Sequence, residues 1–150
     1  MLNVFIRQFT NKNIMYIQRG HQYFLANKYL ENYRLPHPEN VFGVYLGREK
    51  NNEFFPSFAL LDILAQISCE KVIVSELGEL DFLYGKNLKQ KHIIKILGKK
   101  EDGCLKLVQN IHDENLGYGK LIQDSKSHSQ VLKHILDRGI FLKLDRHPEL

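Results

Sequence analysis

Apolar residues occur in short runs along the chain, and residues 58–67 show the clearest periodicity. In this segment apolar side chains recur three and four positions apart, which predicts a helix of about three turns. Ser57 precedes the run and is a good N-cap residue. Shorter runs predict strands at 4–6, 14–17, 22–25 and 41–46, a short helix at 26–33 and a polar loop at 49–53. This mixture predicts an N-terminal α/β lobe.

The pattern changes after residue 69. Residues 71–75 predict a strand, and residues 76–83 predict a short helix whose first turn carries acids that the helix dipole favours. Further strands are predicted at 92–97, 104–109, 117–122 and 139–145, with glycines between or within them. Short strands at this spacing are typical of a small barrel or sandwich. We therefore expect an α+β protein with domains at 1–69 and 70–150, packed together because no flexible linker separates them.

Length and composition restrict the class of protein. A chain of 150 residues with 43% apolar residues can bury a core, and no run is long enough to cross a bilayer. Its first residues lack the features of a signal peptide. With only two cysteines, Cys69 and Cys104, we expect neither a disulfide framework nor a four-ligand zinc site. We expect a reduced, intracellular protein.

The sequence contains no recognisable catalytic pattern. Seven histidines are scattered without the spacing of an HExxH or HxxxH motif. The segment 117–119 (GYG) lacks the third glycine of a dinucleotide-binding loop, and no GxxxxGK[ST] sequence is present. We therefore expect no catalytic residues, no bound metal and no small-molecule cofactor.

Positive charge is concentrated in one segment. The net charge is +4, yet residues 82–100 contain six lysines and no acid. If residues 86–97 are extended, alternate side chains face opposite sides of the strand. The predicted basic face consists of Lys89, Lys91, Ile93 and Lys95, and the opposite face of His92, Ile94 and Ile96. Lys86 belongs to the same basic segment.

A second basic group lies near the C-terminus. In a strand at 139–145, Phe141 and Lys143 share a face, with Arg138 and Arg146 close by in the chain. Cations beside an aromatic ring suit phosphates and stacked bases, and Tyr118 is a further stacking candidate. From charge alone, a solvated strand face or a protected sheet edge is the better interpretation of such a lysine row.

The order of motifs in the second half resembles a PUA domain, a small pseudo-barrel of many RNA-modifying enzymes and RNA-binding factors. The residues that carry this resemblance are 82–85 (FLYG), after a strand and an acidic helix, then 116–119 (LGYG), and the closing segment 139–144 (GIFLKL). The glycines fit the tight turns that such a barrel would need. The resemblance implies a PUA-like β-barrel at 70–150 and RNA binding.

Residues in the first half of the chain resemble one particular family that contains a PUA domain. Residues 22–29 (QYFLANKY) and 44–47 (VYLG), followed by the helix at 58–67, are similar to the Nip-seven-type ribosome biogenesis factors. These join an N-terminal α/β domain to a C-terminal PUA domain, and the resemblance covers about residues 14–147. It implies a non-catalytic factor in large ribosomal subunit assembly and pre-rRNA maturation. Members usually begin with an additional helix, whereas this chain starts almost directly at the predicted strand 4–9.

The family also suggests which residues contact RNA. In its archaeal-type members, basic residues around the last PUA strand are associated with RNA, whereas eukaryotic-type members are more apolar there. Arg138, Lys143 and Arg146 occupy that region, so this chain is closer to the archaeal type. Together with the lysine segment, the RNA-binding candidates are Arg138, Lys143, Arg146, Phe141, Lys86, Lys89, Lys91 and Lys95.

Partners and location follow from the same resemblance. The expected partners are precursor or mature large-subunit rRNA and other ribosome assembly factors, with no membrane, and the expected location is the cytoplasm, or the nucleolus in a eukaryote. Two alternatives stay open. One is a protein–protein adaptor in a pre-ribosomal complex, for which Phe54 and Phe55 in a polar segment are suggestive. The other is the RNA-binding subunit of a tRNA-modifying enzyme.

Overall fold

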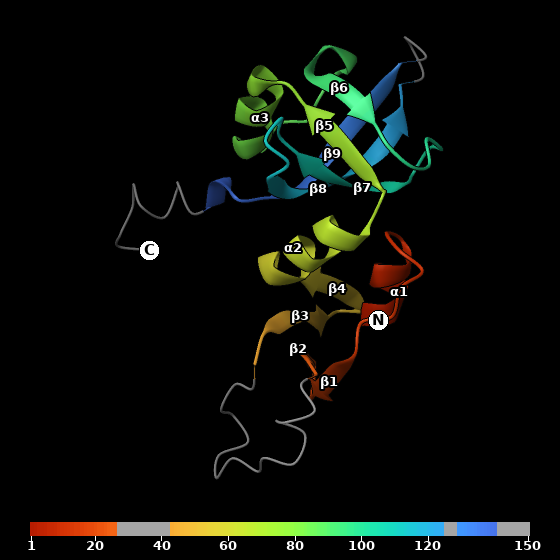
Figure 1. The fold of residues 1–150 in the computed structure, drawn as a ribbon, viewed down its shortest axis with the longest axis vertical. Coiled ribbons are helices and arrows are strands. Elements are labelled where there is room, and N and C mark those ends of the chain that lie inside the picture. Colours follow the sequence, from red (N-terminus) through yellow and green to blue (C-terminus); the bar gives the residue numbers. More distant parts are fainter. Residues whose placement is uncertain (27–42, 125–128, 141–150) are drawn as a thin grey trace. The chain divides into compact units, whose positions relative to one another are not determined.

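The structure is a computed structural model that describes residues 1–26, 43–124 and 129–140. It divides into two compact units, Met1–Ile67 and Ser68–Leu150, where the sequence placed a boundary near residue 69. Each unit combines helical segments with its own sheet (Figure 1), so the predicted α+β class is confirmed.

The described residues of the first unit form two helices and a four-stranded antiparallel sheet. Ser57 begins the second helix, because its Oγ accepts a hydrogen bond from the backbone N–H of Leu60 at 3.1 Å. This helix has the predicted bounds, and it buries Leu60, Leu61 and Leu64. The elements in chain order are α1 (Leu2–Arg7), β1 (Tyr16–Arg19), β2 (Gln22–Leu25), β3 (Tyr45–Lys50), β4 (Glu53–Pro56) and α2 (Phe58–Ile67), and the strand order is β1-β2-β3-β4.

Two predictions for this unit are wrong. The strand predicted at 4–6 is the helix α1, which buries Leu2, Phe5 and Ile6; a short apolar run does not distinguish a strand from a buried helical turn. The predicted polar loop at 49–53 is a tight hairpin between β3 and β4. Asn51 and Asn52 have φ values of 52° and 60°, the left-handed conformation that two-residue hairpin turns need. The helix predicted at 26–33 lies outside the described residues beyond its first position.

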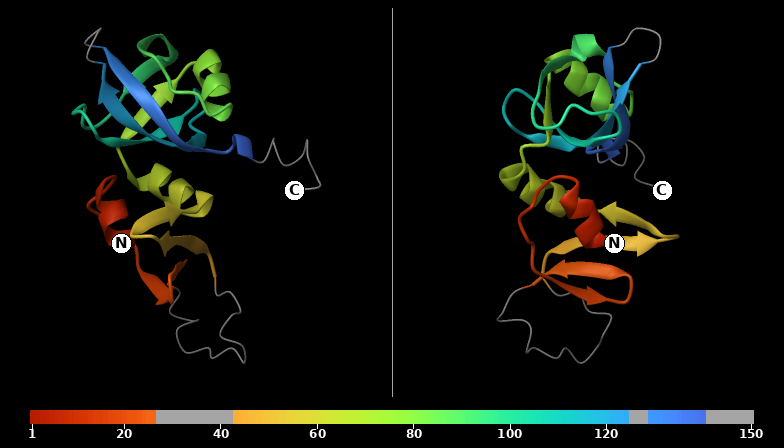
Figure 2. Two further views of the ribbon diagram at one scale, coloured as in Figure 1. Left: turned by 180° about the vertical axis from the view of Figure 1, so that it is seen from behind. Right: turned by 90° about the vertical axis from the view of Figure 1, so that its right-hand side faces the viewer.

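The described residues of the second unit form a five-stranded mixed sheet and a helix beside it. Its elements are β5 (Lys71–Val74), α3 (Glu76–Leu83), a 3₁₀ turn (Gln90–His92), β6 (Ile93–Ile96), β7 (Leu105–Gln109), β8 (Asn115–Gln123) and β9 (Gln130–Asp137). The strand order is β6-β5-β7-β8-β9, and only the β5–β7 pair is parallel among these neighbours. Figures 1 and 2 show the strands curving round a common interior, with α3 at one side. The core includes Val72, Val74, Phe82, Leu88, Val108, Leu116 and Leu132.

The helix α3 has the predicted bounds and an N-cap. Ser75 accepts a hydrogen bond from the backbone N–H of Gly78 at 3.2 Å, and Glu76 and Glu79 lie in the first turn. Local sequence signals are therefore sufficient to define this helix.

Glycines in β8 allow close contact with β9 rather than forming turns, which corrects the prediction. Gly117 has a φ of 143°, and a Cβ there would lie 2.0 Å from the carbonyl oxygen of Leu136. A Cβ at Gly119 would lie 2.6 Å from the carbonyl oxygen of Lys133. Both distances are shorter than any real Cβ contact, so glycine is required at these positions for steric reasons.

The end of the sheet also differs from the prediction. The strand β9 at 130–137 was not predicted, whereas the predicted strand at 139–145 begins with Gly139 and Ile140 in a helical conformation. A Cβ at Gly139 would lie 1.9 Å from the carbonyl oxygen of Leu83, so this position packs directly on the end of α3. Residues 141–145 lie outside the described part of the chain.

Candidate nucleic-acid interface

The basic segment after α3 is attached to β9 by backbone hydrogen bonds. The N–H of Leu88 donates to the carbonyl of Leu132 at 2.9 Å, and the N–H of Leu132 donates to the carbonyl of Leu88 at 2.8 Å. The side-chain oxygen of Asn87 accepts from the backbone N–H of His134 at 2.8 Å. Leu88 and Leu132 are both fully buried. The segment therefore covers the exposed edge of β9 and has a fixed backbone next to its lysines.

A 3₁₀ turn interrupts the extended conformation that the sequence predicted for residues 86–97. His92 ends this turn, is 4% exposed, and accepts a hydrogen bond at Nδ1 from the N–H of Lys89 at 3.3 Å. The predicted single basic face is wrong, because alternation cannot continue through a turn. Lys89 and Lys91 are nevertheless both exposed.

The position of Ile94 is a second departure from the predicted face. Val74 pairs with Ile93 and Ile73 with Lys95, so Ile94 is the additional residue of a β-bulge. Its side chain is 58% exposed instead of facing the core. Lys95 is also exposed.

Lys86 differs from the other lysines of the segment because it has an acidic partner. Its ammonium lies 2.9 Å from the carboxylate of Asp81, which is also 3.5 Å from Nε2 of His92. The hydrogen bond from Lys86, assisted by the charges of Lys86, His92 and Lys91, lowers the pKa of Asp81 below its usual value despite partial desolvation. Lys86 is therefore held on Asp81, and its charge is partly compensated.

Three other lysines of the segment, Lys89, Lys91 and Lys95, are exposed. Within the residues that the structure describes, no carboxylate forms an ion pair with any of them. Exposed cations that form no ion pair produce a positive potential that attracts phosphate.

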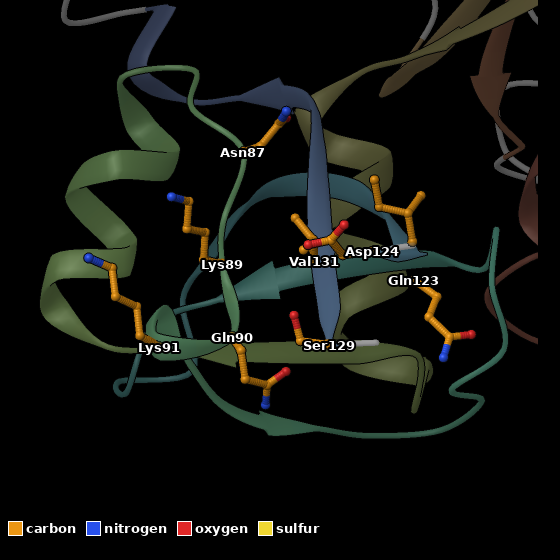
Figure 3. Close-up of a pocket in the computed structure, with 9 residues that line it drawn as sticks. Asn87, Lys89, Gln90, Lys91, Gln123, Asp124, Ser129 and Val131 are labelled. Atoms are coloured by element: carbon orange, nitrogen blue, oxygen red, sulfur yellow. The ribbon is translucent and has the colours of Figure 1, made fainter. Parts of the chain in front are cut away.

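Lys89 and Lys91 lie at the rim of a hollow with a volume of about 710 Å³. Figure 3 shows both side chains extending to the same side of the β9 ribbon, with Gln123 on the opposite side. The lining consists of Asn87, Lys89, Gln90, Lys91, Ile122, Gln123, Asp124, Ser129 and Val131. Lys95 does not line the hollow.

The C-terminal candidates have a different environment. Nε of Arg138 donates to the carbonyl of Asn115 at 2.8 Å, and its backbone N–H donates to the carbonyl of Leu116 at 3.0 Å. Arg138 therefore ties the chain after β9 to β8. Tyr118 is 7% exposed, so its ring is not open to a base. Phe141, Lys143 and Arg146 lie outside the described residues.

Sequence reasoning missed a second pair of lysines. Lys120 on β8 and Lys133 on β9 are direct cross-strand partners, and both are exposed. Recognising them required the β8–β9 register, and β9 itself was not predicted. Sequence spacing also did not show that Asn87, Gln90 and Gln123 line one hollow, because this depends on how the segment packs beside β9.

The described part of the chain contains no group of three or more His, Cys, Asp or Glu side chains that could hold a metal ion. None of its helices combines the length and the apolar character that crossing a membrane requires. Cys69 is exposed, Cys104 is half-buried, and neither forms a disulfide.

Comparison with known families now adds an independent observation. The model of the UPF0113 PUA domain matches residues 70–146, just over half of the chain. The chain belongs to the UPF0113 PUA-domain family. The match runs from β5 through β9. It includes the lysines of residues 82–100 as well as Lys120 and Lys133. No curated protein matches this UPF0113 PUA-domain chain. This match confirms the predicted PUA domain. PUA domains bind RNA, so the exposed lysines lie on an RNA-binding type of domain.

Proposed function

We propose that this UPF0113 PUA-domain protein is a non-catalytic factor that binds single-stranded RNA through Lys89, Lys91 and Lys95. The observation that carries the proposal is the absence of acidic partners for these three exposed lysines among the described residues. Backbone hydrogen bonds between Leu88 and Leu132 hold the segment in place, so little backbone ordering is needed when RNA binds.

The RNA that we propose is the large-subunit rRNA or its precursor. Support comes from the resemblance of residues 22–29 and 44–47 to the Nip-seven-type ribosome biogenesis factors, together with a PUA domain in the second half. The factor would act with other assembly proteins in the cytoplasm, or in the nucleolus of a eukaryote. Archaeal-type character, suggested by Arg138, Lys143 and Arg146, is part of this proposal.

The test of the RNA interface is a pair of charge-matched triple variants. Lys89→Ala/Lys91→Ala/Lys95→Ala removes three positive charges from the proposed interface. Lys12→Ala/Arg48→Ala/Lys50→Ala removes three exposed charges from the first unit. We expect at least about tenfold weaker binding of a single-stranded RNA oligomer for the first variant, and less than about threefold for the control. Equal losses would show a nonspecific effect of net charge and would contradict the proposed interface.

The ribosomal role needs a cellular measurement. RNA crosslinked to the tagged protein in its own cells should be enriched in large-subunit rRNA and its precursor, and the protein should sediment with large-subunit precursor particles. Enrichment of tRNA would instead support the alternative of an RNA-binding subunit of a tRNA-modifying enzyme. Loss of the crosslinks in the lysine variant would connect the cellular RNA to the proposed interface.

One observation favours the adaptor as an additional function. On β4, the ring of Phe54 packs on Phe5 with centroids 5.2 Å apart, whereas Phe55 is 45% exposed. Packing in the core therefore explains the apolar side chain of Phe54, but it does not explain the exposed ring of Phe55. An exposed aromatic ring is a common anchor in protein interfaces. Phe55→Ser should release the protein from precursor particles while its affinity for isolated RNA is unchanged, if this ring contacts an assembly protein.

A further inference from the structure

The floor of the hollow beside Lys89 and Lys91 is apolar, although its rim is polar. Ile122 on β8 and Val131 on β9 are cross-strand partners, and both are half-buried. Their neighbours Leu121 and Leu132 are fully buried and face the core, so Ile122 and Val131 belong to the outer face of the sheet. A flat ring can therefore rest on this pair through apolar contact.

Amide side chains are available at the rim of the same hollow. Gln90 and Gln123 are exposed and line it together with Asn87. Figure 3 shows Gln90 and Gln123 on different sides of β9. An amide has both donors and an acceptor, so it can hydrogen-bond to the edge of any nucleic-acid base.

Lysines lie on two sides of the apolar floor. Lys89 and Lys91 line one side of the hollow. Lys120 and Lys133 lie two residues from Ile122 and Val131 on their strands, and strand alternation places them on the same outer face. Like charges directly opposite each other on neighbouring strands cost free energy, and a bound phosphate would remove this cost. The arrangement therefore provides two positions for phosphate.

The floor of the hollow suits a planar group better than a phosphate, because the side chains of Ile122 and Val131 offer no hydrogen-bond donor. Asp124 also lines the hollow, and Figure 3 shows its carboxylate beside Val131. A base on this floor would have its phosphates on the lysines at either side.

We infer that this hollow binds the base of one unpaired nucleotide, with the phosphates on its two sides held by Lys89 and Lys91 and by Lys120 and Lys133. The base rests on Ile122 and Val131, and the glutamine amides contact its edge. The volume of about 710 Å³ lies in the range of small-molecule sites and is sufficient for a single nucleotide. The inference rests on the proposed RNA-binding function and states which part of the RNA is recognised at this place.

The test compares two small probes that share a phosphate and a ribose. Uridine monophosphate and ribose 5-phosphate are titrated into the complete protein, and methyl and side-chain amide signals are followed by NMR. We expect the nucleotide to shift the methyl signals of Ile122 and Val131 and the amide signals of Gln90 and Gln123, whereas ribose 5-phosphate leaves them in place. Equal shifts with both probes would mean a plain anion site and would overturn the inference.

Two variants test the same point with RNA. Val131→Trp should fill the hollow and weaken binding of a single-stranded RNA oligomer about fivefold or more, whereas Val131→Ile should bind like the wild type. Gln90→Ala/Gln123→Ala changes only exposed side chains, so it keeps the test valid if the tryptophan variant does not fold. Unchanged RNA affinity in folded variants of both kinds would contradict the inference.

Different results would rule out the nucleotide site and the RNA-binding function. If the RNA oligomer binds and the lysine triple variant abolishes binding, but uridine monophosphate shifts none of these signals, RNA binding stands and the nucleotide site is wrong. If the RNA oligomer does not bind to the wild type at all, the proposed function fails, and the assignment of the hollow to RNA fails with it.

Discussion

Leu88 and Leu132 exchange two backbone hydrogen bonds, with N···O distances of 2.9 and 2.8 Å, and their side chains are both fully buried in the core of the second unit. The strand order leaves β6 and β9 at the edges of the sheet, and this bridge joins β9 to the segment that precedes β6. Leu88 is thus one of the residues that attach the lysines of that segment to the core. Stability and RNA binding should therefore be linked at Leu88.

The first prediction concerns the contribution of Leu88 to stability. Leu88→Ala removes a fully buried side chain and should lower the free energy of unfolding by about 2–4 kcal/mol, measured by urea denaturation. Leu77→Ala changes an exposed leucine of α3 and should cost less than about 1 kcal/mol. Similar values for the two variants would show that Leu88 is not part of the core.

The second prediction concerns a buried charge in the same unit. Lys106 is fully buried, and its ammonium contacts the Glu70 carboxylate and lies 2.6 Å from the carbonyl oxygen of Leu97. Lys106→Met leaves Glu70 without its partner, so we expect a loss of about 3–5 kcal/mol in unfolding free energy. Adding Glu70→Gln should restore part of the lost unfolding free energy, because the side chain at position 70 is then neutral and needs no cation beside it. A double variant less stable than Lys106→Met would contradict this explanation.

The third prediction follows from Asp81. Its pKa is lowered in the folded protein by the hydrogen bond from Lys86, so folding favours the charged carboxylate. This stabilisation is complete at neutral pH, and it is lost as the pH falls below the usual value near 3.8 towards the lowered pKa. Asp81→Asn should therefore be less stable than the wild type at pH 7, and urea denaturation should show the difference shrinking in acid. A difference that is constant with pH would argue against the ion pair.

The fourth prediction concerns the first unit at alkaline pH. Burial, with a hydrogen bond to Glu49, raises the pKa of Tyr23 from 10.0 to about 12. The neutral phenol is favoured in the folded state, so its stabilisation is present below pH 10 and is lost as the pH rises towards 12. The stability advantage of the wild type over Tyr23→Phe should shrink by about 1 kcal/mol between pH 9 and pH 11. If urea denaturation shows no such change, Tyr23 titrates normally.

Local signals explain which elements could be predicted from the sequence. The helices α2 and α3 have their predicted bounds because Ser57 and Ser75 cap them. The strand β9 was missed because Val131 and Leu132, and later Ile135 and Leu136, form apolar pairs that hide the alternation of a strand. Its register is determined by contacts with β8, where Gly117 and Gly119 allow the strands to approach, and such contacts are not visible in local sequence.

The candidate site was predictable only as a concentration of charge. The sequence identified Lys89, Lys91 and Lys95 as basic, and the structure shows that they are exposed. It could not show that Asp81 compensates Lys86, because this depends on how the chain turns after α3. The pairing of Lys120 with Lys133 depends on strand register, so sequence spacing gave no sign of it.

Salt dependence of RNA binding tests the central claim most directly. The affinity of the wild type, the Lys89/Lys91/Lys95 triple alanine variant and the charge-matched control for a single-stranded RNA oligomer is measured across a salt series. Each lysine–phosphate contact contributes about −0.7 to the slope of log K against log salt, so the triple variant should be shallower by about 2. The control should keep the slope of the wild type. Equal slopes for all three proteins, or wild-type binding that does not depend on salt, would contradict RNA recognition through these lysines.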